Sequence, residues 1–159
     1  MSSNACAGSS PAPGTIVKRV TKIHLDASIN ENVILFGIVS HAADYKLSLA
    51  LNQKIGISLK RSDSITICDD FGNEHSFSRF TTSTTLTGNV DYTLTSNRSG
   101  SFFMLKKLKN IDYLFHINNS DNCDLRLKIS TILREIENID AVFPLDIKTL
   151  NDKNTSYLI

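Results

Sequence analysis

The sequence predicts an α+β fold, with two helices packed on a largely antiparallel or mixed sheet. An apolar, strand-like run at 33–39 is followed by a helical stripe and by alternating residues up to position 60, and the same strand–helix–strand order returns at 111–145. Short alternating segments separated by turn residues fill the interval between these two units. If both connections are right-handed, both helices lie on one face of the sheet, which gives a ferredoxin-like split βαβ arrangement with an inserted β-meander.

The N-terminal segment differs in composition from the rest of the chain. Residues 1–15 are mostly Ser, Ala, Gly and Pro, which offer too little apolar surface to offset the entropy lost on ordering. We therefore predict a disordered tail over 1–15 and one α+β domain over 16–159, a usual size for a single domain. Residues 16–25 mix β-branched and charged side chains with a loose period of two, which predicts an outer strand.

The first unit begins with residues 33–39, which are apolar on both faces and so typical of a central strand covered on both sides. Within this strand, Gly37 indicates a close backbone approach or a bulge. We expect Ser40 to cap the next helix, which ends near position 52 or 53. Its apolar stripe has the spacing of one helix face: Ala43, Leu47, Ala50 and Leu51.

Antiparallel strands are expected in the middle of the chain. Residues 55–60 and 64–68 alternate apolar and polar side chains around three turn-prone residues, which predicts a hairpin. A turn follows at 69–74, and the odd spacing of Phe77 and Phe80 then indicates a bulged strand. More short strands continue this meander up to the second unit.

The second unit contains the clearest helix of the sequence. Its apolar stripe, behind a group of capping residues at 120–122, has helical spacing: Leu125, Ile129, Ile132, Leu133 and Ile136. The strand that precedes it, at 111–117, alternates apolar residues toward the core. Because Pro144 cannot donate a hydrogen bond to a ladder, we expect the strand at 141–146 to lie at a sheet edge. Residues 157–159 are apolar enough to dock back on the domain.

Composition and charge exclude several classes of partner and location. The chain has 17 Lys and Arg against 16 Asp and Glu, so its net charge of +1 provides no overall attraction for nucleic acid or membranes. The longest apolar run is far shorter than the roughly 20 residues of a membrane-spanning helix. The N-terminus lacks the segments of a secretory signal, so we expect a cytoplasmic protein. The three cysteines include no C-x-x-C pair, which argues against disulfides and structural zinc: Cys6, Cys68 and Cys123.

Catalytic and cofactor motifs are missing from the sequence, which contains no P-loop, dinucleotide-binding, nucleophile-elbow or H-E-x-x-H string. We therefore predict no catalytic residue, no cofactor and no metal site, and favour a protein that is not an enzyme. Cys123 stands where a helix dipole lowers a thiol pKa, but Asp124 opposes this and no base is close in sequence. The densest group of metal-ligand types lacks calcium-loop spacing and is better explained as a solvated turn: Asp69, Asp70, Asn73, Glu74 and His75.

One stretch of the second half, L-K-K-L-K-N-I-D-Y at 105–113, matches a family signature. Further similar strings lie at 34–40, 44–47, 51–56, 59–61, 95–97, 114–115, 145–146 and 153–154. Together they resemble a small bacterial family of unknown function that is named for its I-P-E-x-x-x-V-D-Y signature. The resemblance covers residues 18–159.

The match to the signature is partial. Lys106 and Lys107 stand where the signature has Pro and Glu, so any role of that pair does not carry over. Ile111, Asp112 and Tyr113 match as signature positions, without a known function. The resemblance implies a bacterial, cytoplasmic, single-domain protein and brings no activity, substrate or cofactor.

Two functions are favoured for a chain without catalytic motifs, and a small-molecule enzyme is a distant third that a deep apolar pocket with convergent polar groups and a shifted titratable residue would revive. The first is a non-enzymatic protein–protein interaction module, in which the loop before Asp112 and Tyr113 presents a surface to a cytoplasmic protein partner. In such a module we expect Asp112 to hold the loop through backbone amides, with Tyr113 packed beneath it. A homodimer that pairs the edge strand at 141–145 across a two-fold axis is compatible with the same sequence.

The second function is RNA binding through a local basic patch. Its expected phosphate contacts come from one loop: Arg98, Lys106, Lys107 and Lys109. Tyr92, Phe102 or Phe103 would supply the rings on which bases stack. The alternative explanation is that these cations are ordinary solvated charges on edge strands, which the near-zero net charge favours.

Overall fold

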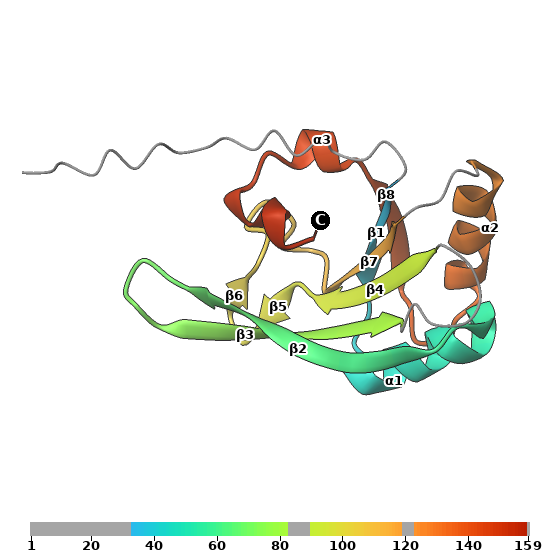
Figure 1. The fold of residues 1–159 in the computed structure, drawn as a ribbon, viewed down its shortest axis with the longest axis horizontal. Coiled ribbons are helices and arrows are strands. Elements are labelled where there is room, and N and C mark those ends of the chain that lie inside the picture. Colours follow the sequence, from blue (N-terminus) through green and yellow to red (C-terminus); the bar gives the residue numbers. More distant parts are fainter. Residues whose placement is uncertain (1–32, 83–89, 119–122, 159) are drawn as a thin grey trace, which may run out of the picture.

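The computed structural model describes residues 33–82, 90–118 and 123–158 (Figure 1). The predicted tail at 1–15, the predicted strand at 16–25 and the capping residues at 120–122 lie outside the described residues. Within them the strands of the main sheet are β1 (Ile34–Val39), β2 (Leu59–Cys68), β3 (Glu74–Thr82), β4 (Asp91–Ser96), β7 (Tyr113–Asn118) and β8 (Ala141–Leu145). The remaining elements are α1 (Asp44–Leu51), the π-helix η1 (Asn52–Gly56), β5 (Arg98–Ser99), β6 (Phe102–Phe103), α2 (Cys123–Arg134), α3 (Ile147–Leu150) and the 3₁₀-helix η2 (Lys153–Tyr157).

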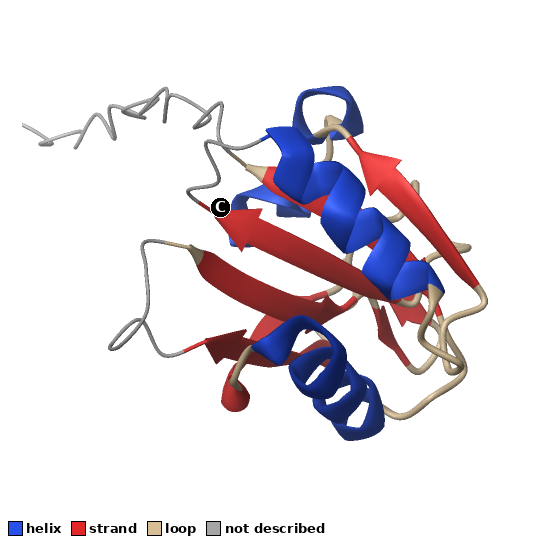
Figure 2. Ribbon diagram, turned by 90° about the vertical axis from the view of Figure 1, so that its right-hand side faces the viewer, coloured by secondary structure: helices blue, strands red, loops and turns tan. Residues whose placement is uncertain are grey.

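The main sheet has the order β2-β3-β4-β7-β1-β8, and each neighbouring pair is antiparallel. Because β7 and β8 both run antiparallel to the strand between them, they are parallel to each other, and α2 connects them. In the same way, α1 connects β1 to the far edge strand β2. Both helices lie on one face of the sheet (Figure 2). The α+β class and the split βαβ arrangement are therefore confirmed, with β3 and β4 added between β2 and β7.

Two apolar cores lie on the two faces of this sheet. The core under α1 and α2 includes buried residues of both helices and of the strands: Phe36, Leu47, Leu51, Phe80, Leu94, Phe115, Ile129 and Leu133. The opposite core lies under the loop at 97–112, α3 and the C-terminal segment: Leu35, Phe77, Met104, Leu105, Ile111, Leu114, Ile147, Leu150 and Leu158. Alternate residues of each strand point to opposite cores, as the pleat requires.

The hairpin predicted at 55–60 and 64–68 is wrong. The side chain of Asn52 accepts a hydrogen bond from Leu59 N at 2.7 Å and donates to Leu59 O at 3.2 Å, so the chain after α1 forms a π-helix and the strand begins only at Leu59. From there β2 continues unbroken to Cys68, and the turn-prone residues form a β-bulge between Ser62 and Ile65. That bulge lies on β2 and not on β3, as had been predicted from the phenylalanine spacing.

The cap predicted for the first helix is also wrong. The N-cap position is Ala43, which has no side-chain capping bond. Ser40 lies earlier, where its hydroxyl accepts a hydrogen bond from Ala42 N at 3.2 Å and donates one to the carbonyl of Asn138. It therefore ties the end of β1 to the segment after α2. The edge position of β8, predicted from Pro144, is confirmed, because β8 pairs with β1 alone.

Candidate functional site

The loop at 97–112 is organised around the fully buried side chain of Asn97. Its Oδ1 accepts a hydrogen bond from Leu105 N, and its Nδ2 donates to the carbonyls of Leu108 and Ile111, each at 2.9 Å. Its backbone N–H donates to the carbonyl of Asp112 at 2.8 Å. One amide side chain thus supplies three of the bonds that hold this loop closed.

The matched signature residues connect the same loop to the sheet. Asp112 Oδ2 accepts a hydrogen bond from Ser40 N at 3.1 Å. Tyr113 is buried, and its hydroxyl donates to the carbonyl of Ala42 at 2.7 Å. Burial raises the pKa of Tyr113 to about 12, with nearby carboxylates adding to the rise, so the phenol stays protonated and remains a donor. The side chain of Ile111 lies in the core beneath the loop.

Two of the predicted phosphate contacts lie over aromatic rings. The guanidinium carbon of Arg98 is 5.9 Å from the ring centroid of Phe103, and Lys106 Nζ is 5.8 Å from that of Phe102. Both rings are half-buried residues of β6. The cations therefore sit beside aromatic surface, at the distance of a cation–π contact.

The other two predicted phosphate contacts belong to the exposed part of the loop. Lys107 Nζ donates a hydrogen bond to the backbone carbonyl of Asn151 at 3.3 Å, which links the loop to the segment after α3. Lys109 is exposed. Two of the four cations therefore already have a bond within the chain, because Arg98 Nε also donates a hydrogen bond to the carbonyl of Gly100 at 2.9 Å.

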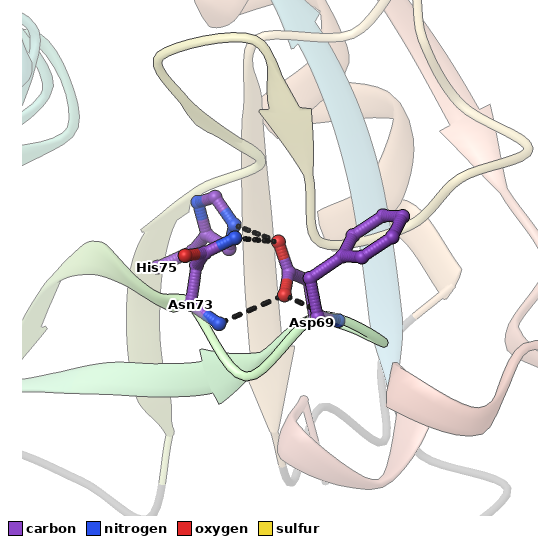
Figure 3. A network of polar contacts seen from close by, with 4 residues as sticks. Asp69, Asn73 and His75 are labelled. Carbon is purple, nitrogen blue, oxygen red and sulfur yellow. Dashed lines mark hydrogen bonds and ion pairs between the residues drawn. The ribbon is translucent and has the colours of Figure 1, made fainter.

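The turn between β2 and β3, residues 69–75, is closed by a single carboxylate, and we call it the hairpin tip (Figure 3). Asp69 Oδ1 accepts hydrogen bonds from the backbone N–H groups of Phe71 at 2.9 Å and Asn73 at 2.8 Å. Its Oδ2 accepts one from Asn73 Nδ2 at 2.9 Å and lies 3.2 Å from His75 Nε2. Gly72 supplies the positive φ of 84° that the turn needs.

These bonds hold Asp69 in its charged form. The side-chain amide of Asn73 contributes most to lowering the pKa of this carboxyl well below its usual range, and backbone amides and His75 lower the pKa further. Burial acts in the opposite direction and is outweighed. At neutral pH the carboxylate is therefore a permanent acceptor for the turn.

The hairpin tip is also braced against the body of the protein. The ring of His75 stacks on that of Phe102, with centroids 4.0 Å apart and an interplanar angle of 6°. Phe102 in turn lies 6.3 Å from the ring of Phe77, which is fully buried in the core of that face. A continuous set of contacts therefore runs from the Asp69 carboxylate to the core.

The most exposed large apolar side chain of the described residues lies at this tip. Phe71 is 91% exposed, although the backbone on both sides of it is fixed by Asp69. Two acidic residues close to Phe71 in the sequence, Asp70 and Glu74, are also exposed. Among the described residues, no three His, Cys, Asp or Glu side chains converge closely enough to hold a metal ion. The arrangement presents an aromatic ring rather than a coordination site.

A second feature, on the sheet face opposite α1 and α2, was missed by sequence reasoning. A pocket of about 250 Å³ is lined by polar residues of β3, β4 and β7 and by Leu158 of the C-terminal segment. Its charged or titratable members are Arg79, Asp91 and His116. Burial, with Arg79 adding to the effect, lowers the pKa of His116 to about 4, so the imidazole is neutral at physiological pH.

Comparison with known proteins assigns no family to this chain. It matches no protein-family model and no curated protein. In the part of the chain that the structure describes, no helix combines the length and the apolar composition needed to cross a membrane. The hairpin tip, the loop at 97–112 with its four cations and the polar pocket are therefore the features from which a function is inferred.

Proposed function

We propose that this chain is a cytoplasmic protein–protein interaction module, and that its contact point is Phe71 at the hairpin tip. The observation behind the proposal is the near-complete exposure of this ring on a turn that the Asp69 carboxylate holds closed. An exposed phenylalanine contributes nothing to the stability of its own fold, whereas its burial against a partner stabilises a complex by about 2 kcal/mol. Aromatic side chains are enriched at the centres of such interfaces for this reason.

The rigidity of the tip strengthens this proposal. Binding costs free energy when a loop or side chain must first be ordered. Here the backbone of Phe71 is fixed before any partner arrives, because Asp69 accepts hydrogen bonds from the amides of Phe71 and Asn73 and His75 stacks on Phe102. In Figure 1 the hairpin also extends beyond β5 and β6, so that its end is free to enter a partner.

The charge at the tip indicates the chemistry of the partner. Asp70 and Glu74 are exposed carboxylates on either side of Phe71 in the sequence, and Asp69 adds a third that is bonded within the turn. A complementary surface therefore has an apolar pocket for one phenyl ring and a rim of Lys or Arg residues. Nucleic acid, whose phosphates repel carboxylates, does not fit this tip.

The test is capture from native lysate by the wild-type chain and by Phe71→Ala, followed by reconstitution with the purified partner. We expect one protein to be retained by the wild-type chain with or without nuclease treatment, and its Kd to rise roughly thirtyfold in the variant, in line with the loss of about 2 kcal/mol. A photo-cross-linking residue at position 71 should form an adduct with the same protein.

Phe143→Ala is the matched control, since Phe143 is another exposed phenylalanine, 48% accessible, on the edge strand β8. Its affinity for the partner should equal that of the wild-type chain. Equal binding by Phe71→Ala, or an adduct that forms as well from position 143 as from position 71, would show that the tip is not the contact point.

RNA binding is the second candidate, favoured by the placement of Arg98 over Phe103 and of Lys106 over Phe102. A patch of this kind offers phosphates a charge and bases a ring. It predicts binding to single-stranded RNA that weakens steeply with salt. Replacement of Lys106, Lys107 and Lys109 by Glu should abolish binding, while Phe71→Ala should not affect it. No binding at low salt would exclude this candidate.

A further inference from the structure

The polar pocket is built by alternate residues of three neighbouring strands. Thr93 of β4 lies opposite both Thr81 of β3 and His116 of β7 in the ladders, so these residues form the floor. Arg79 pairs with Thr95, whereas Asp91 pairs with Asn118. Positions 95 and 91 are separated by about 13 Å along β4, given the strand rise of about 3.3 Å per residue. Arg79 and Asp91 therefore approach the pocket from opposite ends, with His116 between them.

Each of these three side chains has a buried atom without a partner. Arg79 Nε, Asp91 Oδ1 and His116 Nε2 are buried and make no hydrogen bond within the described residues. His116 itself is only 7% exposed. An unsatisfied buried polar atom costs free energy in the absence of a ligand, so three of them around one pocket are unusual and call for a binding partner.

The charges decide what kind of molecule fits. Arg79 is a cation, Asp91 an anion and His116 neutral, and no ion pair joins the first two within the described residues. An anion would satisfy Arg79 but meet the carboxylate, and a cation would satisfy Asp91 but meet the guanidinium. A molecule that has both an acidic and a basic group satisfies both ends at once.

We propose that this pocket binds a small zwitterion of the amino-acid class, with its carboxylate on Arg79 and its ammonium group on Asp91. His116 Nε2 and the hydroxyls of Thr81 and Thr93 provide the hydrogen bonds between the two charged ends. The volume agrees, because about 250 Å³ holds roughly eight waters at about 30 Å³ each, which is the size of a free amino acid and below that of drug-sized ligands. This site is separate from the hairpin tip, so a negative result for one proposal does not count against the other.

The test uses the full chain labelled with ¹⁵N and observes the ring nitrogens of its histidines by NMR. The probes are zwitterions of increasing charge separation, namely glycine, β-alanine, γ-aminobutyrate and δ-aminovalerate, together with the proteinogenic L-amino acids. We expect at least one probe to shift the His116 ring resonances in a saturable way, while those of the exposed His41 do not move. The fatty acid and the alkylamine of the same chain length, which each lack one charge, should bind about tenfold more weakly or worse.

Variants then assign the two ends of the ligand. Arg79→Gln and Asp91→Asn should each weaken binding about tenfold or more, whereas Arg126→Gln and Asp70→Asn, at exposed positions away from the pocket, should leave it unchanged. The wild-type titrations decide the proposal even if a pocket variant fails to fold. It is overturned if no zwitterion shifts His116, or if the matched acid or amine binds as tightly as the zwitterion.

Discussion

Single side chains decide whether the loop at 97–112 can pack on the sheet. Gly37 of β1 is the clearest case, since a Cβ there would collide with the Cδ1 atom of Ile111 and come within 3.1 Å of Leu145. Any larger residue at this position forces these side chains to shift, and the backbone angle itself does not call for glycine. The sequence predicted a close backbone approach or a bulge at Gly37, but the atoms that approach are side-chain atoms of Ile111 and Leu145, and the pairing of β1 is regular there.

Gly37→Ala should therefore destabilise the protein by about 1–3 kcal/mol through overpacking. Ile111→Val removes the atom that the new methyl group meets, and by itself should cost about 1 kcal/mol. The double variant should lose less stability than the sum of the two single variants, by about 1 kcal/mol, in urea unfolding. Strict additivity would contradict the contact.

Asn97→Ala should cost about 3 kcal/mol, because the amide of Leu105 and the carbonyls of Leu108 and Ile111 lose their partner. Asn110→Ala, on the exposed part of the same loop, should change the free energy of unfolding by less than about 0.5 kcal/mol. Equal losses in the two variants would mean that Asn97 does not organise the loop.

Among the elements, the β2–β3 hairpin depends on the Asp69 carboxylate, which leads to a test by hydrogen exchange. Asp69→Ala should speed the exchange of the Phe71 and Asn73 amides with little effect on the rest of the chain, and Asp70→Ala should not. Because the folded-state pKa of Asp69 is lowered, its contribution is complete above the unfolded value of about 3.9 and is lost only as the pH falls below it. Protection of these amides in Asp69→Ala equal to that of the wild-type chain would show that the turn holds without its carboxylate.

Elements defined by local pattern could be predicted from the sequence, and those defined by distant contacts could not. The apolar run of β1, the helical stripe of α2 and the edge position of Pro144 follow from periodicity and from missing donors. The start of β2 could not be predicted in this way, because it depends on the hydrogen bonds between Asn52 and Leu59, which are seven residues apart.

The same distinction applies to the sites. The residues of the hairpin tip are contiguous, so turn chemistry identified them, although not the exposure of Phe71. The pocket residues come from three strands: Arg79, Asp91 and His116. Their only signal in the sequence is a polar residue at alternate positions of each strand. This pattern indicates a pocket only when the strand order β3-β4-β7, which places the three strands side by side, is known.

For the molecule as a whole, the buried His116 makes stability depend on pH. Its pKa is about 4 when folded, lowered first by burial and then by Arg79 with Asp91 opposing, against 6.5 when unfolded. The unfolded chain therefore binds the additional proton between these values, and stability, complete above pH 6.5, falls as the pH decreases toward 4. The loss should approach about 3 kcal/mol, at about 1.4 kcal/mol per pH unit.

Urea unfolding of the wild-type chain and of His116→Gln across this pH range measures the effect. The variant should lose less stability than the wild-type chain between pH 6.5 and 4. His41→Gln is the control, because His41 is exposed and its replacement should leave the pH dependence unchanged. A parallel pH dependence in wild type and His116→Gln would assign the effect to other groups.

The place of β1 between β7 and β8 also determines when the protein can fold during synthesis. Ile34 pairs with Ile117, and Leu35 pairs with Leu145, so the most apolar of the described strands has no neighbour until β7 has left the ribosome and lacks the second until β8, the last strand, has followed. Pairings of such long range close slowly, and unpaired apolar strands aggregate. For most of its synthesis the nascent chain must therefore keep β1 from pairing with other chains, and a ribosome stalled before residue 145 would release an aggregation-prone fragment.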